Sequence, residues 1–213
     1  MSKLVIIAHP DDETLFFSSI LDKSTKVICV TDANADGRGK EREAEFARAL
    51  AMYDVQDYEM WDFEDIYEKR LPIKELVFKL KRFQADQIYT HAPIGEYGHP
   101  HHQDVSRAVY EVFDADKIFI PAFNAFPSQV NEINKEDFIK KMKVLTEIYG
   151  KETSRFLNLI PATSVETFMQ MEQDEVVNVY NYLTGVTDTI KSTTYIMHSE
   201  VLKSAYKDRE RTF

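Results

Sequence analysis

The chain of 213 residues has little of several residue types on which whole classes of protein depend. Its single cysteine, Cys29, excludes an internal disulfide framework and a cysteine-rich zinc module. Six glycines and seven prolines are too few for a fibrous or low-complexity chain. The remaining composition, 44% hydrophobic and 29% charged, is ordinary for a globular protein. We therefore expect one domain over residues 1–213, with Cys29 as a small buried hydrophobic residue.

Basic residues and long apolar runs are also scarce. Lysine and arginine number 26 against 36 acidic residues, and the net charge of −10 argues against binding to nucleic acid or to an anionic bilayer. No apolar run approaches the roughly 18–20 residues that span a bilayer. The first run, at residues 4–8, passes directly into His-Pro-Asp-Asp-Glu, which resembles no secretory signal. These features predict no nucleic-acid partner, no membrane span and a cytoplasmic location.

Common nucleotide and nucleophile motifs are absent as well. The sequence contains no glycine-rich dinucleotide fingerprint, no P-loop and no His-Glu-x-x-His zinc motif. It also lacks the Gly-x-Ser-x-Gly elbow of serine hydrolases. The sequence therefore offers no support for chemistry that depends on those motifs.

Strand-like and helix-like patches alternate in the first half of the chain. The runs at 4–8 and 26–31 are continuous and apolar, as strands buried on both faces are. Further strands are expected at 58–63, 87–90 and 117–121, with helices at 41–52, 73–83 and 100–113. An additional amphipathic helix is expected directly after Asp11-Asp12-Glu13. The alternation predicts an α/β fold with a Rossmann-like, mainly parallel sheet flanked by helices.

The pattern loosens after Pro121. We expect helices at 139–149 and 174–183 in a less regular C-terminal part, residues 124–213, beside an α/β core formed by residues 1–123.

Two polar clusters follow predicted strands, at residues 8–13 and 95–102, and together they hold four of the six histidines. Ligands of open α/β sheets bind at the carboxyl ends of the strands, so both clusters are expected at one crevice. A catalytic zinc ion takes three His, Asp or Glu ligands and leaves one position for water. His9 and Asp12 are three residues apart, as are His99 and His102. One pair from the first cluster and one histidine from the second would complete such a site.

The residues beside these ligands have the chemistry of general acids and bases. Asp11 neighbours a ligand and could take a proton from a metal-bound water, whose pKa is near 7 on zinc. The spare histidine of the second cluster could stabilise an oxyanion. Iron, cobalt and manganese suit the same donors. Two simpler interpretations stand beside this one: Asp11-Asp12-Glu13 as a helix N-cap, and the histidine string as a solvated loop.

The two motifs resemble those of the PIG-L/LmbE-like family of zinc-dependent N-deacetylases. Ala-His-Pro-Asp-Asp-Glu occupies residues 8–13, and Gly-His-x-x-His occupies residues 98–102. The resemblance extends over about the first 110 residues. It implies an enzyme that acts on acetylated amino sugars with a zinc ion, and a C-terminal part that covers the substrate.

By position, the resemblance implies metal ligands at His9, Asp12 and His102. It implies a general base at Asp11 and places the residue that stabilises the tetrahedral intermediate at His99.

Three further residues are implied to contact the sugar. Arg42 and Glu45 match an Arg-x-x-Glu that opens the second helix, although a surface ion pair on any helix has the same spacing. Asp62 or Asp65 matches an acidic residue that holds a sugar hydroxyl.

The sequence also departs from the family pattern. His101 stands where many members have aspartate, and the Ser-Gln that often follows a late helix is missing. His198 matches no family residue, and we interpret it as a structural or surface residue. The predicted function is removal of an acetyl group from an N-acetylglucosamine-type sugar or its conjugate. The alternatives are a carbohydrate-binding protein of the same fold without turnover, and a metal hydrolase of another amide or ester.

Overall fold

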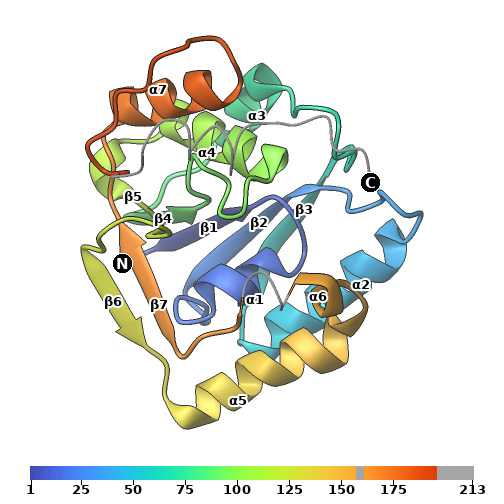
Figure 1. The fold of residues 1–213 in the computed structure, drawn as a ribbon. Helices are drawn as coiled ribbons and strands as arrows, with labels where there is room; N and C mark the ends of the chain where they lie inside the picture. Colours follow the sequence, from blue (N-terminus) through green and yellow to red (C-terminus); the bar gives the residue numbers. More distant parts are fainter. Residues whose placement is uncertain (157–160, 196–213) are drawn as a thin grey trace.

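The computed structural model describes residues 1–156 and 161–195 of the chain, and it consists of a seven-stranded sheet with helices on both faces (Figure 1). The first part contains β1 (Lys3–Ile7), α1 (Asp12–Phe17), β2 (Thr25–Thr31), α2 (Gly39–Met52), β3 (Asp57–Phe63), α3 (Ile73–Leu80), β4 (Gln87–Thr90), α4 (Pro100–Val112), a 3₁₀ turn η1 (Ala115–Lys117) and β5 (Ile118–Pro121). The second part contains β6 (Gln129–Glu132), α5 (Lys135–Lys143), a π-helical turn η2 (Val144–Ile148), α6 (Gly150–Phe156), β7 (Val165–Met169) and α7 (Gln173–Leu183).

The sheet has the strand order β3-β2-β1-β4-β5-β7-β6. Strands β1 to β5 pair in parallel, and β7 joins β5 antiparallel before pairing antiparallel with β6. The predicted α/β fold with a mainly parallel sheet is therefore confirmed. Strands β6 and β7, through which the second part of the chain extends the sheet of the first, were not predicted.

The position of β1 decides where the two polar clusters meet. β1 pairs with β2 on one side and with β4 on the other. The helices α1 and α2 cover one face of the sheet, whereas α3 and α4 cover the opposite face (Figure 1). The chain thus leaves the adjacent strands β1 and β4 toward opposite faces. This is the topological switch point at which open α/β sheets bind ligands.

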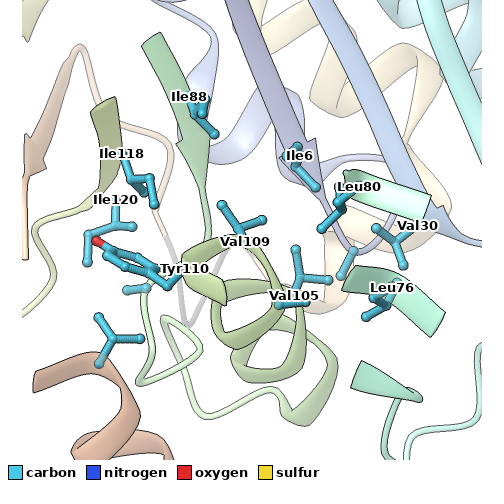
Figure 2. Packing of buried hydrophobic residues seen from close by; sticks show 14 of the residues in the cluster. Ile6, Val30, Leu76, Leu80, Ile88, Val105, Val109, Tyr110, Ile118 and Ile120 are labelled. Atoms are coloured by element: carbon cyan, nitrogen blue, oxygen red, sulfur yellow. The ribbon is translucent and has the colours of Figure 1, made fainter. Parts of the chain in front are cut away.

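The two faces of the sheet carry two apolar cores. Side chains along β1 alternate between them, since Ile6 packs with the helices α3 and α4 and Ile7 packs with α1 and α2. Figure 2 shows the first core, in which Leu76 and Leu80 of α3 lie near Ile6 and Val105 of α4. Cys29 is fully buried in the second core, as predicted. None of the described helices has the length and apolar character needed to cross a membrane.

Two helices differ from their sequence predictions. The prediction of an amphipathic α1 is wrong, because all six residues of this helix are buried. Its outer side is covered by the second part of the chain, where Phe168 stacks on Phe17 with 6.0 Å between ring centroids. The helix expected at 139–149 instead begins at Lys135, after the Asn134 side chain accepts a hydrogen bond from Asp137 N. It then passes into the π-helical turn, which buries Val144 and Leu145.

A buried ion pair attaches the second part of the chain to α1. Lys141 Nζ lies 2.7 Å from Glu166 Oε1, and both side chains are nearly inaccessible to solvent. Glu166 also accepts hydrogen bonds from Ser18 N at 3.0 Å, Ser18 Oγ at 2.6 Å and Ser19 N at 2.9 Å, at the end of α1. The second contact of Lys141 Nζ is Thr163 O at 3.5 Å. The carboxylate is therefore much better satisfied than the ammonium group.

This asymmetry predicts unequal costs for removing the two partners. Glu166→Ala leaves a buried ammonium group without its counter-charge and should lower the free energy of unfolding by about 3–5 kcal/mol. Lys141→Met leaves the Glu166 carboxylate with its three remaining hydrogen-bond donors, and the methionine side chain fills the space of the lysine stem. The loss in free energy of unfolding should therefore be clearly smaller. Denaturant unfolding of both variants measures the difference. Equal losses would contradict the asymmetry.

Candidate active site

The first polar cluster lies in the turn that connects β1 to α1. Asp11 precedes the helix with a backbone φ of 106°, a conformation that side chains rarely adopt. Its carbonyl accepts from Thr14 N and Leu15 N, but its side chain makes no capping hydrogen bond. The N-cap interpretation is therefore wrong for Asp11. The Asp11 carboxylate lines a cavity instead.

Three donor atoms of the predicted ligand set meet at Asp12. Its Oδ2 accepts from His9 N at 2.8 Å and lies 3.5 Å from His9 Nδ1 and 3.4 Å from His102 Nε2. Burial alone would raise the pKa of Asp12, but the protonated forms of His102 and His91 outweigh it and hold this pKa well below its usual value. Asp12 Oδ2 thus lies within 3.5 Å of a ring nitrogen of both His9 and His102, and donor atoms of His9, His99 and His102 lie within 4.8 Å of one another as a candidate cation group.

Glu96 determines which nitrogen of His102 faces that oxygen. Glu96 Oε2 lies 2.6 Å from His102 Nδ1 and 2.9 Å from His91 Nδ1, while Oε1 accepts from Ala92 N. Burial would raise the pKa of Glu96, yet the two imidazoles lower it to about 2. A carboxylate accepts hydrogen bonds, so each ring carries its proton on Nδ1. His102 Nε2 then presents a lone pair. It is buried and has no hydrogen-bond partner within residues 1–156 and 161–195.

His91 has the same acidic partner but a different role. Its Nε2 accepts from Ala8 N at 3.0 Å, and its ring stacks on His102 with 3.8 Å between centroids. Donor atoms of Asp12, His91 and His102 lie within 4.8 Å of one another and form a candidate cation group. Because the lone pair of His91 already accepts a backbone hydrogen bond, we infer that His91 orients His102 rather than ligating.

The loop between β4 and α4 places Glu96 under these rings. Gly95 has a φ of 72°, and a Cβ there would lie 2.6 Å from His99 O. Glycine is therefore needed at this close approach. The following residue, Glu96, also has a positive φ, 52°.

His99 is the N-cap residue of α4. Its Nδ1 accepts from His101 N at 3.3 Å, so the neutral ring carries its proton on Nε2. Burial lowers the pKa of His99 well below its usual value, and the nearby His9, His102 and His101 add to the effect. The ring packs edge-on against Tyr67, with 5.0 Å between centroids, and lines the cavity beside His9. His99 therefore supplies a neutral N–H donor.

The cavity has a volume of about 330 Å³, within the usual range for small-molecule sites. It is lined by His9, Asp11, Ala33, Ala35, Asp36, Arg42, Asp65, Tyr67, Tyr97, His99 and Glu152. Of the described residues beyond 123, Glu152 is the one that contributes to this lining.

Arg42 reaches the cavity from α2. Its guanidinium group donates to Pro10 O, lies 3.4 Å from Asp11 Oδ2 and pairs with Glu152 Oε2 at 3.2 Å. Burial raises the pKa of Asp11 well above its usual value, and the charge of Arg42 opposes that rise. The surface-pair interpretation of Arg42 and Glu45 is wrong, because both side chains are buried.

The other residues predicted to contact the sugar lie in different places. Glu45 pairs with Arg38 at 3.4 Å and does not line the cavity. The Asp62 side chain is 90% exposed, pairs with Lys79 at 2.8 Å and lines a separate pocket of about 670 Å³ over the start of α2, outside the cavity. Asp65 is the aspartate of the two that lines the cavity, 3.2 Å from His9 Nε2. Burial would raise the pKa of Asp65, but His9 and His101 hold it well below its usual value.

His101 is fully buried, so the solvated-loop interpretation of the histidine string is wrong. Its Nε2 lies 3.0 Å from Ile66 O and 2.9 Å from Lys69 O, and its Nδ1 lies 3.2 Å from His9 Nε2. The residue that departs from the family pattern thus contacts a predicted ligand directly. His198 lies outside the described residues.

Sequence reasoning missed His91, Glu96, Tyr67 and Glu152. His91 follows β4 directly, as His9 closely follows β1, and that placement could have identified it. Glu96 stands between two glycines of the second motif. Glu152 carries no local signal, because tertiary contacts alone bring it to Arg42.

Comparisons with known proteins identify the family. Residues 4–113 match the model of the PIG-L family, GlcNAc-PI de-N-acetylase. An uncharacterized protein of Acanthamoeba polyphaga mimivirus is 31% identical over 169 residues, which is 70% of this chain and 71% of the viral protein. A probable N-acetylglucosaminyl-phosphatidylinositol de-N-acetylase of Schizosaccharomyces pombe is 29% identical over 123 residues. That match spans 47% of each of the two proteins, so less than half of the fission yeast protein is represented.

Solved structures show the same fold. The N,N'-diacetylchitobiose deacetylase of Pyrococcus horikoshii superposes with a TM-score of 0.60 at 18% identity, over 81% of this chain and 84% of that chain. The zinc inhibited form of the teicoplanin deacetylase Orf2 superposes with a TM-score of 0.55 at 15% identity, over 80% of this chain and 99% of that chain. With its two motifs placed at one switch point and half of its length matched by the family model, the chain belongs to the PIG-L, GlcNAc-PI de-N-acetylase family.

Proposed function

We propose that this protein is a hydrolase that removes the acetyl group from an N-acetylglucosamine-type amino sugar or its conjugate, using a divalent metal ion, zinc in the first instance. Family membership supports the reaction class, as do the names of the fission yeast relative and the Pyrococcus neighbour. The observation that carries the proposal is the buried lone pair of His102 Nε2, which lacks a hydrogen-bond partner among the described residues and lies 3.4 Å from Asp12 Oδ2.

The donor set fits a metal of this kind. Two imidazole nitrogens and a carboxylate oxygen are common zinc ligands, and a buried lone pair with no proton donor is unfavourable unless a cation occupies the site. We assign His9, Asp12 and His102 as the ligands. When bound, the ion polarises the acetyl carbonyl as a Lewis acid and acidifies the hydrolytic water.

The chain's own residues then perform the proton transfers. Asp11 accepts a proton from the water as its oxygen attacks the acetyl carbon, and it delivers that proton to the sugar nitrogen as the C–N bond breaks. The products are acetate and the free amine. Arg42, 3.4 Å from Asp11 Oδ2, orients the carboxylate. His99 donates its Nε2–H to the oxygen that gains charge in the tetrahedral state.

The cavity accommodates a polar substrate of limited size. Asp36, Asp65, Tyr67 and Tyr97 line it with groups that can hydrogen-bond to hydroxyls. A panel of acetylated amino sugars and other amides and esters, assayed for released amine or alcohol, tests the substrate class. Amine release from an N-acetylated sugar supports the proposal over a hydrolase of another amide or ester. Sugar binding without turnover would favour the carbohydrate-binding alternative.

Glu96→Gln should weaken metal binding about 10–100-fold, the usual effect of removing a hydrogen-bond partner from a metal-ligating histidine. The amide oxygen can take the place of Oε2 beside His91 Nδ1 and His102 Nδ1, but it is uncharged, and the amide nitrogen then faces the donor Ala92 N where Oε1 now accepts. Competition with a chromophoric chelator measures the change. An unaltered affinity would show that Glu96 does not set the orientation of His102.

Asp11→Asn should keep the bound metal and lose turnover by about 10²–10⁴-fold, because the amide cannot accept the proton. Metal analysis and the amine-release assay, performed on the same preparation, measure both quantities. Glu68→Gln removes one exposed carboxylate from a nearby loop and serves as the control. Near-normal turnover in the Asp11 variant would remove this residue from the mechanism.

His99→Asn should separate the two roles of His99. The Asn oxygen can take the place of Nδ1 and cap α4, but the variant has no donor where Nε2–H lies. We expect a fall in kcat of about 10²–10³-fold with little change in KM, and partial recovery in His99→Gln, whose amide N–H reaches farther. A change confined to KM would argue for substrate binding instead of oxyanion stabilisation.

A further inference from the structure

The far edge of the His9 ring faces a second group of donor atoms. His9 Nε2 lies 3.2 Å from His101 Nδ1 and 3.2 Å from Asp65 Oδ1, and those two atoms are 3.5 Å apart. These atoms come from three separate segments: the turn after β1, the loop after β3 and the first turn of α4. The proposed mechanism uses none of them for ligation, since it uses only Nδ1 of His9.

Backbone contacts fix the proton of His101. Its Nε2 lies 3.0 Å from Ile66 O and 2.9 Å from Lys69 O, and carbonyl oxygens only accept hydrogen bonds. Nε2 therefore carries the hydrogen, and the neutral ring has its lone pair on Nδ1. That lone pair faces His9 and Asp65 from a side chain that is fully buried. Without a cation, a proton on His9 Nε2 is shared with His101 Nδ1 and Asp65 Oδ1.

The three distances match the face of a tetrahedral zinc site. With metal–ligand distances of about 2.0–2.1 Å, two tetrahedral ligands lie about 3.3–3.4 Å apart. The edges of the triangle are 3.2, 3.2 and 3.5 Å. His9 and Asp65 line the cavity, so a cation can reach the group from the substrate side and a fourth position can hold water.

We infer that His9 Nε2, Asp65 and His101 form a second, weaker site for zinc or a similar divalent transition metal, which competes with the first site for His9. A neutral imidazole has one lone pair, so His9 serves one cation at a time. An ion at the second site leaves the first ion with Asp12 and His102 and occupies the cavity. Excess metal therefore inhibits the enzyme. This inference rests on the proposed first metal site but not on the identity of the substrate.

Two variants remove the second site in different ways. Asp65→Asn removes the anionic ligand. His101→Gln keeps an N–H near Ile66 O and Lys69 O, where the long amide places its nitrogen, but removes the lone pair at Nδ1. Glu68→Gln removes one exposed carboxylate from the same loop as Asp65 and is the matched control.

The experiment counts bound zinc by equilibrium dialysis and metal analysis over rising free zinc, with amine release measured in parallel. The wild type and Glu68→Gln should bind a second ion more weakly than the first and lose activity over the same zinc range. Asp65→Asn and His101→Gln should each bind one ion over that range. Wherever either variant retains turnover, inhibition should need at least about tenfold more zinc. His102→Gln should lose the tighter ion and keep the weaker one.

A wild type that never exceeds one bound ion would overturn the inference, as would a second ion retained unchanged in both Asp65→Asn and His101→Gln. Loss of the second ion in Glu68→Gln would assign it to surface carboxylates and would overturn it too. The ion count does not depend on turnover. A failure to release amine from any acetylated sugar would therefore count against the proposed function alone.

Discussion

The hydrogen bond between His102 Nδ1 and Glu96 Oε2, 2.6 Å long, holds a proton on one side of the ring and leaves the other side bare. The bare nitrogen, Nε2, lies 3.4 Å from Asp12 Oδ2 in a buried environment. A lone pair and a carboxylate oxygen at that distance repel each other unless a proton or a cation lies between them. The neighbouring strands β1 and β4 bring these atoms together, and the loop at Gly95 holds Glu96 beneath them.

His99, His101 and His102 share one principle. Each uses one ring nitrogen on a fixed partner, and that partner determines what the other nitrogen can do. His102 binds Glu96 and keeps a lone pair for a cation, whereas His99 caps α4 and keeps an N–H for substrate. His101 donates to two backbone carbonyls and keeps a lone pair that faces His9. His101, the residue that departs from the family pattern, thus supplies the lone pair that faces His9 Nε2.

The sequence predicted the parallel strands and the meeting of His9, Asp12 and His102, because continuous apolar runs mark buried strands and strand ends mark ligand sites. It could not predict contacts between distant segments. Glu166 and Lys141 are 25 residues apart, yet they form the buried pair that holds the end of α1. The edge strand β6 was not predicted because its four residues include only one apolar side chain and show no strand pattern. Glu96 was missed because its role depends on which ring protons it accepts, which spacing does not reveal.

The most direct test of this account is a crystal structure with anomalous scattering collected at the zinc edge, from protein carrying one equivalent of zinc. We expect a single anomalous peak within about 2.3 Å of His9 Nδ1, Asp12 Oδ2 and His102 Nε2, with Glu96 still hydrogen-bonded to His102 Nδ1. A peak bound by His91 in place of His9, or the absence of a peak among these three side chains, would contradict it.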